Sequence, residues 1–558
     1  MLCAKRAKFR SYPAEVRIPE RLSKMMVIAL LTCGSLVGSV ALIVQGAGRK
    51  DSIEHDEGIS FINSAGKMSD WMNATAHHVA PVGGWAPATD WQYFWRVGNA
   101  FDFGVIAQGL AAWDIHPPLY FWLLHIWSLC FGMTPASSIG LNVLLTVLAG
   151  IALFGMARWA FEDTIFAALT VCLWALASPT VGAALVARQY VLLSLVSVLA
   201  AWAALAFFTP ARRPRVTEML VVGVAIAAGL LTYYQFALLV AGLMIWLTIT
   251  CWGRWRHLIL LYGSGVIGIM ILLVAHPGFT HSLSVLSQAN TTHADLNTAT
   301  RSGRTVAALS RIVCPAFGSP SLGGSWFAPA VVLLLGVVLV AVAVVVAARL
   351  GRDGEALAWM PRPRVLALSM LGVWSLALIV ILYLTGRSPT HAMADRYLAM
   401  VLPFAAFLPL ALLRPAGPSR RGGAVIATIL VVVLGGISVA GQLQVNATAN
   451  PNLPVVTALS GARHVVIDSL ARGIVPRVLI DAPASLEVYV DRESRLLSDP
   501  AAWADRLGSG DVVVSDPSYA ESAELRAEFI EELEQRFVVS QLPASGPMQW
   551  WRIEARKP

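Results

Sequence analysis

The feature that most limits how this chain can fold is a series of long apolar segments within its first 445 residues. A helix needs about 17 to 25 residues to cross the hydrocarbon core of a bilayer. Twelve segments come near this length, at about residues 25–45, 117–133, 139–158, 164–180, 188–208, 217–231, 236–252, 258–275, 327–348, 365–384, 396–413 and 424–441. With 57% hydrophobic and 13% charged residues, the chain is too apolar for a soluble globular protein. We therefore predict an all-α polytopic membrane protein.

Clusters of arginine between the segments set the expected orientation. Such clusters mark the cytoplasmic side of a membrane protein, and they occur at residues 212–215, 254–256, 349–364 and 414–421. The loops 47–116, 276–326 and 385–395 and the tail after Gly441 are then expected outside. The basic N-terminus is expected inside, ahead of an uncleaved first span. An odd number of crossings follows, so we expect 11 to 13 spans, with the segment after His116 the weakest candidate.

The charge of the chain divides it into two domains. From residue 445 onward there are 11 Lys and Arg against 16 Asp and Glu, a net charge of −5, whereas the preceding part carries +13. We predict a membrane module over residues 1–445 and a soluble extracytoplasmic α/β domain over residues 446–558. The positive-inside pattern accounts for the basic residues, so nucleic acid is not expected as a partner.

Short β-branched segments alternate with helical ones in the tail. Strands are expected at residues 464–467, 477–480, 511–514, 536–539 and 550–553, and a helix at 522–535. No catalytic motif is evident there, so a docking or stabilising role is favoured for this domain.

An acidic pair, Asp56 and Glu57, follows the first apolar segment almost at once. A carboxylate at the boundary between membrane and water loses hydration, so a charged partner or a functional demand usually keeps it there. Asp56 is the candidate for a general base, with Glu57 beside it. Simple solvation of a loop is an equal alternative for these two residues alone. His116 is the third candidate catalytic residue, because Pro117 and Pro118 fix the loop that carries it.

Arginines and tyrosines on the same face are candidates for binding a lipid phosphate. Arginine offers a bidentate fork to phosphate oxygens, although interfacial snorkelling explains any single one equally well. The candidate donor-binding residues are Arg188, Tyr190, Tyr234, Arg387, Arg396 and Tyr397.

No cofactor is required by the sequence. The spacing of His55, His77, His78 and His116 matches no standard zinc pattern, so no metal ligands are assigned. A divalent ion near Asp56 and Glu57 stays open as an alternative. The glycine-rich segment at residues 263–268 lies within an apolar span, which indicates close helix packing and not a dinucleotide site.

The first external loop is rich in tryptophan, at positions 71, 85, 91, 95 and 113. Most of these residues are expected to anchor the loop at the membrane surface, together with an amphipathic stretch over residues 93–112. The second external loop, at residues 276–326, is long enough to close over a site.

In order along the chain, several motifs resemble bacterial membrane glycosyltransferases of the GT-C superfamily. The resemblance is to the branch of the protein O-mannosyltransferases and the lipid A aminoarabinose and galacturonic acid transferases. It covers about residues 25–413, and its most specific parts are the acidic pair and the run from His116 to Tyr120. The other matching motifs are Ser178-Pro179, Ala187-Arg188-Gln189-Tyr190, Leu231-Thr232-Tyr233-Tyr234, Arg396-Tyr397-Leu398 and Leu402-Pro403.

The resemblance implies transfer of a sugar from a polyprenyl-phosphate donor to a lipid, glycan or protein acceptor, with inversion at the anomeric carbon. By position, Asp56 matches the catalytic aspartate of the family, and Arg188, Tyr190, Arg396 and Tyr397 match further family positions. Gln189 departs from the residue that many relatives carry, and the first external loop is longer than in compact members.

Two other functions fit parts of the sequence. A ligase or polymerase of lipid-linked oligosaccharides would depend on the external arginines and not on Asp56. A transporter or flippase would place ionisable residues at mid-span and often contains internal repeats, whereas the spans here are nearly free of charge and no repeat is evident. The bias towards Ala, Val and Arg indicates a bacterial inner membrane protein with its site facing the periplasm.

Overall fold

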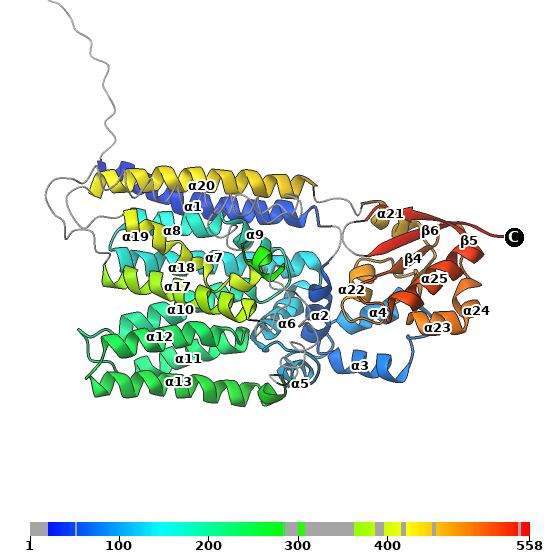
Figure 1. Cartoon of the computed structure of the whole chain (residues 1–558), viewed down its shortest axis with the longest axis horizontal. Helices are drawn as coiled ribbons and strands as arrows, with labels where there is room; N and C mark the ends of the chain where they lie inside the picture. Colours follow the sequence, from blue (N-terminus) through cyan, green and yellow to red (C-terminus); the bar gives the residue numbers. More distant parts are fainter. Residues whose placement is uncertain are drawn as a thin grey trace, which may run out of the picture.

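The computed structural model describes residues 20–50, 53–282, 284, 300–306, 362–385, 395–413, 420–448, 453–544 and 548–558. A bundle of long apolar helices forms one part of the molecule, and a smaller α/β part lies at one end of the bundle (Figure 1). The predicted fold class, a helical membrane protein with a small C-terminal α/β domain, is confirmed.

Among the described residues, six helices are long and apolar enough to cross a bilayer. They are α1 (Glu20–Ala47), α7 (Pro135–Phe161), α10 (Tyr190–Phe207), α13 (Trp255–Ala275), α17 (Pro363–Leu384) and α20 (Arg420–Thr448). Helices α8 (Thr164–Ala175) and α9 (Ser178–Ala184) meet at 59° and form a further apolar pair, which is either a broken span or a re-entrant loop. The predicted count of 11 to 13 spans stays a prediction, since the expected span at 327–348 lies outside the described residues.

Several expected spans are shorter or broken in the structure. Helices α6 (Leu119–Phe131) and α12 (Phe236–Thr250) have 13 and 15 residues, whereas α11 (Val216–Thr232) has 17 and slightly exceeds the expected 217–231. The segment expected as one span over residues 396–413 is not a continuous helix, because the chain there forms η3 (Asp395–Leu398), α18 (Leu402–Ala405) and α19 (Phe407–Leu413). Proline explains this break, since Pro403 and Pro409 remove backbone donors and start new turns.

The glycine-rich segment of α13 packs closely against α11, as predicted. A Cβ on Gly268 would lie 2.6 Å from Ile226 Cγ2, and one on Gly223 would lie 2.7 Å from Ile267 Cγ2. Glycine is therefore needed on both helices for this approach.

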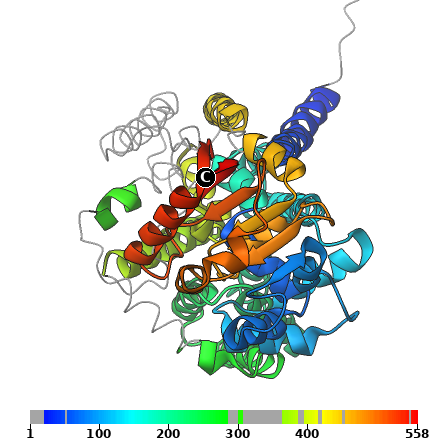
Figure 2. The ribbon, with the colours of Figure 1, turned by 90° about the vertical axis from the view of Figure 1, so that its right-hand side faces the viewer.

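A six-stranded sheet organises the end of the molecule that lies beyond the bundle. Its order is β1-β3-β2-β4-β6-β5, with β2 parallel to both β3 and β4 and the other pairs antiparallel. The strands are β1 (Trp85–Pro87), β2 (His464–Ile467), β3 (Glu487–Val490), β4 (Val512–Ser515), β5 (Phe537–Leu542) and β6 (Gln549–Arg556). The edge strand β1 comes from the first external loop, so this loop and the tail share one sheet (Figure 2).

The two faces of the sheet bury different partners, because alternate residues of a strand point to opposite faces. Val465 and Ile467 join the large core that continues into the bundle, whereas Val466 packs with Trp503 and Phe529. The helices of the tail are α21 (Leu453–Gly461), α22 (Ile474–Leu479), α23 (Glu493–Ser498), α24 (Pro500–Ala504) and α25 (Ala523–Arg536).

One strand of the tail was predicted wrongly. Residues 477–480 belong to α22 and its end, and the missed strand is β3. Val475, Val478 and Leu479 are all buried, and their spacing fits one face of a helical turn. The other expected strands and the expected helix are present in the structure, with small shifts at their ends.

Burial in the first external loop corrects the expectation for its tryptophans. This loop folds into α2 (His55–Ser64), α3 (Met68–His77), α4 (Ala88–Gln92), η1 (Tyr93–Trp95) and α5 (Phe103–Trp113). Trp71, Trp91 and Trp95 are buried instead of anchoring at the membrane surface, because they form the interior of this layer. Ring centroids of Trp71 and Phe94 lie 5.1 Å apart, edge to face. The amphipathic stretch expected over 93–112 is a helix only from Phe103.

Candidate active site

The acidic pair lies in the first turn of α2, at the end of the bundle nearest the sheet (Figure 1). Carboxylates are favourable there, since the N-terminus of a helix carries partial positive charge. Because successive helical residues point in different directions, the two acids face different surroundings. The Glu57 side chain is fully buried, whereas that of Asp56 is 32% exposed.

Glu57 ties α2 to the rest of the membrane module. Its Oε2 accepts hydrogen bonds from Lys50 Nζ at 2.5 Å and from the Glu54 backbone N–H at 2.7 Å. Its Oε1 accepts from the Ala187 backbone N–H at 2.8 Å. Lys50 also donates to the Leu185 carbonyl at 2.6 Å, so the segment before Arg188 is held on two sides. These contacts favour a positioning role for Glu57.

Arg188 is the buried cation of the site, in the loop between α9 and α10. Its Nη2 lies 3.7 Å from Asp56 Oδ2 and 3.2 Å from His116 Nε2. Its Nη1 donates to the Asp56 carbonyl at 3.3 Å and to Ser60 Oγ at 3.2 Å. Burial alone would lower the pKa of Arg188, but Asp56 and other nearby groups raise it above its usual value. The Arg188 guanidinium is therefore a permanent positive charge that is buried within the protein.

His116 connects Arg188 to a second carboxylate. Its Nδ1 lies 2.7 Å from Asp114 Oδ1, and Asp114 Oδ2 accepts from Asn63 Nδ2 at 2.9 Å. Because a guanidinium can only donate, His116 Nε2 is the acceptor, and the proton of the neutral ring is then on Nδ1, facing Asp114. Burial would raise the pKa of Asp114, but contact with His116 and the charge of Arg188 lower it below its usual range.

Tyr120, the last residue of the His116–Tyr120 motif, is linked through Asn142 to the backbone that precedes Arg188. Tyr120 is fully buried and donates to Asn142 Oδ1 at 3.3 Å. Asn142 Nδ2 in turn donates to the carbonyls of Ala184 and Val186, at 3.1 and 2.7 Å. The motif therefore fixes both His116 and the backbone that presents Arg188.

Three tyrosines gather beside His116. Tyr190 contacts both Tyr233 and Tyr397 edge to face, with ring centroids 6.5 and 5.9 Å apart. Tyr233 stacks on His116 at 6.5 Å. Tyr234, which was a predicted donor-binding residue, instead contacts His276, with its hydroxyl 2.9 Å from Nε2. Neighbouring residues point apart here because Tyr233 has extended backbone angles.

Two predicted arginines cannot be placed against this site. Arg387 lies outside the described residues, and only the backbone of Arg396 is described, as part of η3. Most of the expected lid, residues 276–326, is also outside the described residues.

The four histidines considered for a metal ion do not gather. His55 contacts Tyr519, His78 pairs with Asp491 at 3.3 Å, and His116 pairs with Asp114. No group of three or more potential ligands is found within the part of the chain that the structure describes. Asp56 faces Arg188 and Glu57 faces Lys50, so the pair does not offer a divalent ion two converging carboxylates.

The C-terminal domain contacts α2 directly, which sequence reasoning missed. Tyr519 Oη lies 2.8 Å from His55 Nδ1, and the two rings meet edge to face at 4.1 Å. Burial lowers the pKa of His55 to about 4, so this ring is neutral near pH 7. Arg472 donates to the Trp113 carbonyl. The domain thus lies beside the residue that precedes Asp56.

Other missed residues were detectable in the sequence. Ser60 and Asn63 follow Asp56 by four and seven residues, which is one stripe of a helix. Both are buried, and they contact Arg188 and Asp114 respectively. The helical spacing of these polar residues after Asp56 was the available signal. For Tyr519 and Arg472 no local signal existed.

Residues 115–277 match the model of the family described as dolichyl-phosphate-mannose-protein mannosyltransferase. The predicted resemblance to the GT-C superfamily is confirmed. The matched segment takes in His116, Arg188, Tyr190 and Tyr234, whereas Asp56 and the C-terminal domain lie outside it.

Two solved structures of ArnT from Cupriavidus metallidurans are similar to this chain. The apo structure shares 16% sequence identity over 95% of this chain and 98% of that one, with a TM-score of 0.39. The structure bound to undecaprenyl phosphate shares 14% identity over 96% and 98%, with a TM-score of 0.38. These scores are too low to transfer site residues between the chains. No curated protein matches the sequence.

Proposed function

We propose that this chain is an inverting glycosyltransferase, which moves a sugar from a polyprenyl-phosphate donor to an acceptor hydroxyl. The observation that supports this most is the buried Arg188 guanidinium, held between Asp56 and His116. The family match supports the donor class, because dolichyl phosphate is a polyprenyl phosphate.

Asp56 is the proposed general base. An acceptor hydroxyl attacks the anomeric carbon from the face opposite the phosphate, and its proton passes to the Asp56 carboxylate. The bond between the anomeric carbon and the phosphate oxygen breaks, and the polyprenyl phosphate leaves with the electron pair. The partial exposure of Asp56, at 32%, leaves this carboxylate open to an acceptor.

Arg188 is the proposed partner of the leaving phosphate. A fixed positive charge in a site that excludes water stabilises negative charge as it develops. Its Nε–H is buried and has no hydrogen-bond acceptor among the described residues, and the same holds for the side-chain amide of Gln189. Such groups are costly unless a ligand satisfies them. Asp114 and His116 hold the guanidinium in place, and Tyr190, Tyr233 and Tyr397 line the same region.

The proposed location is a bacterial inner membrane, with the site facing the periplasm. Arg188 precedes α10, and Arg212 follows the other end of that helix together with the predicted cytoplasmic arginines. The acceptor class, whether lipid, glycan or protein, stays open, and the transfer needs no metal ion in this scheme.

The proposal is tested in a deletion strain that carries either the wild-type chain or Asp56→Asn. Mass spectrometry of the envelope glycolipids, glycans and glycoproteins should show one hexose-type or related modification that only the wild-type chain restores. Asp70→Asn is the matched control, because Asp70 is a half-exposed acid of the same loop. Restoration by Asp56→Asn at wild-type level would overturn the assignment.

Adding Arg188→Gln and an assay in permeabilised membranes separates the rival functions. A ligase that uses external arginines would lose activity in Arg188→Gln while retaining it in Asp56→Asn. A flippase would leave the lipid-linked sugar on the inner leaflet when deleted, without loss of transfer in permeabilised membranes.

A further inference from the structure

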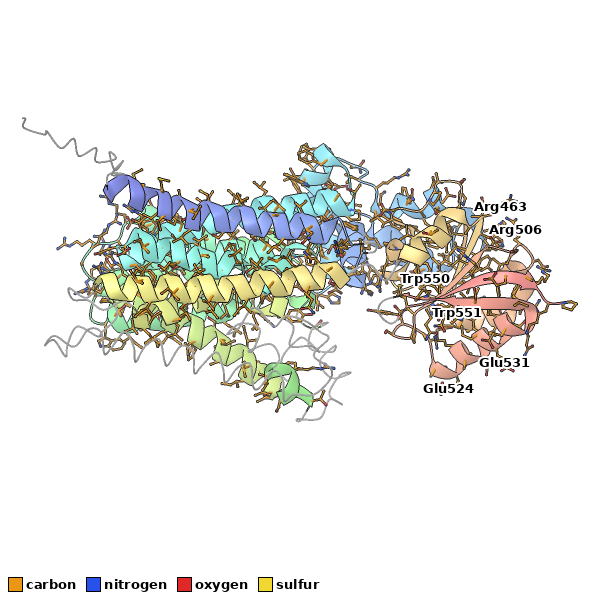
Figure 3. All side chains as sticks on the ribbon, turned by 90° about the horizontal axis from the view of Figure 1, so that it is seen from above. Arg463, Arg506, Glu524, Glu531, Trp550 and Trp551 are labelled. Carbon is orange, nitrogen blue, oxygen red and sulfur yellow. The ribbon has the colours of Figure 1, made fainter. Side chains whose placement is uncertain are left out.

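A cavity of about 310 Å³ lies between the C-terminal domain and the end of the helical bundle. Helices α21 and α22 and the residues 480–483 that follow α22 supply most of its lining, and Lys50 comes from the segment after α1. Trp550, which lines it, lies nearer to the bundle than Arg463 and Arg506 do (Figure 3). None of the residues proposed for sugar transfer lines this cavity, so its ligand is a separate question.

A guanidinium lies at the polar end of the cavity. Arg477 is partly buried, and its guanidinium makes no hydrogen bond or ion pair within 4.0 Å to any residue that the structure describes. Burial lowers its pKa, although the acids Asp516, Glu54 and Glu57 oppose this effect. Arginine remains charged under these conditions. A buried guanidinium with open donors calls for an anionic ligand.

Lys50 and Asp481 limit which chemical groups can accompany the anion in the ligand. Lys50 already donates to Glu57 and to the Leu185 carbonyl, which leaves at most one of its three N–H groups for a ligand. Asp481 also lines the cavity, and burial raises the pKa of its carboxyl. A head group that places a phosphate on Arg477 and a hydroxyl or amine on Asp481 would satisfy both.

The other walls of the cavity are apolar. Val455, Leu459, Met548 and Trp550 line it, and Val456 lies at its edge with 42% of its surface exposed. A free phosphate ion makes no favourable contact with apolar side chains, whereas burying them under acyl chains is favourable.

The cavity also lies close to where two membrane spans end. Lys50 follows α1 by three residues, and α21 begins five residues after α20. The two span ends are joined, since Arg49 Nη1 donates to the Asn446 carbonyl at 3.0 Å and Asn446 Nδ2 donates to the Leu42 carbonyl at 3.1 Å. A lipid head at the membrane surface can therefore reach the cavity.

We propose that this cavity is a binding site for a membrane lipid whose head carries a phosphate and a hydrogen-bond donor. Arg477 binds the phosphate, Asp481 accepts from the hydroxyl or amine, and the chain of the lipid lies against Val456 and Leu459. The lipid would fasten the C-terminal domain to the bundle. This site does not depend on the proposed sugar transfer.

The test is native mass spectrometry of the full-length protein in detergent, titrated with phosphatidylglycerol. The variants are Arg477→Gln, which removes the charge, and Val456→Glu, which places a carboxylate on an exposed part of the apolar wall. Each should weaken phosphatidylglycerol binding about tenfold or more. Arg463→Gln, an exposed arginine of the same domain, should bind like the wild type.

Two comparison ligands identify the source of the phosphate. Phosphatidylcholine has no hydrogen-bond donor on its head and should bind more weakly than phosphatidylglycerol. Inorganic phosphate at millimolar concentration should not displace the lipid; displacement, or a site that takes phosphate alone, would overturn the lipid assignment. Equal phosphatidylglycerol binding by the wild type and Val456→Glu would also overturn it, even if Arg477→Gln failed to fold.

Discussion

The backbone of Gly473 lies directly against His55. A Cβ at Gly473 would be 2.2 Å from the His55 carbonyl oxygen and 2.3 Å from its Cδ2. On the facing helix, a Cβ at Gly58 would be 3.0 Å from Gly473 Cα. Both surfaces therefore approach with backbone alone, and the C-terminal domain is seated on the first turn of α2, beside Asp56.

We expect Gly473→Ala to disrupt the contact between Gly473 and His55. Backbone atoms cannot move aside as a side chain does, so the substitution should destabilise the protein by about 1 to 3 kcal/mol and displace Asp56. Thermal unfolding and sugar transfer should both fall. Gly461→Ala is the matched control, because a Cβ there meets nothing within 4 Å. Equal melting temperatures for the two variants would show that the contact between Gly473 and α2 does not contribute to stability.

Arg188→Lys tests whether the shape of the guanidinium matters in addition to its charge. Arg188 contacts the Asp56 carboxylate, Ser60 and His116 at once, and an ammonium cannot span all three. Transfer should fall about 100-fold, measured as initial rate in membranes matched for protein level. Arg212 is half-exposed and pairs with the buried Glu218 beyond the other end of α10, and Arg212→Lys should keep wild-type activity. Full activity in Arg188→Lys would mean that a point charge suffices.

Tyr519→Phe tests the contact between the C-terminal domain and His55. The hydroxyl bond at 2.8 Å is lost while the edge-to-face ring contact stays, so the stability cost should be about 1 kcal/mol. If Tyr519 positions α2 for the base, kcat should fall several-fold with little change in KM. Tyr93→Phe removes hydrogen bonds to Lys67 and Asp70 at an exposed site and should leave kcat unchanged. A purely structural role would lower the melting temperature without altering kcat.

The sequence could predict what depends on local pattern. Hydropathy located the six long apolar helices of the described residues, and β-branched runs located β2 and β4. The acidic pair and His116 were found because their charge is unusual beside apolar segments. The pairing of Arg188 with both was not predictable, because it joins residues 72 and 132 positions apart.

Contacts between distant segments explain the other misses. Trp71 and Trp91 were expected at a membrane surface, but their composition does not reveal that a folded layer covers them. Strand β1 is three residues long and is defined by its pairing with β3, some 400 residues later. Gly473 and Tyr519 acquire their significance only once the tail is docked on α2.

The last prediction concerns Asp468, at the carboxyl end of β2. Burial, with a further contribution from Glu493, raises the pKa of Asp468 to about 8. Its carboxyl is therefore protonated in the folded protein at pH 7, whereas in the unfolded chain it ionises near pH 4. Between these values the folded state binds more protons than the unfolded state. Its contribution to the free energy of unfolding therefore falls as pH rises from about 4 to about 8, by at most about 1.4 kcal/mol per pH unit.

Asp468→Asn should remove this dependence, because a neutral amide of similar shape replaces the carboxyl. We expect the variant to melt at a higher temperature than the wild type at pH 8, and the difference to shrink towards pH 5. Melting curves over this range, read as the difference between the two proteins, cancel the titration of all other groups. Asp505→Asn, whose side chain is 66% exposed in the same domain, should follow the wild type throughout. A difference in melting temperature that is constant with pH would mean that Asp468 is already ionised in the folded protein, and would contradict the prediction.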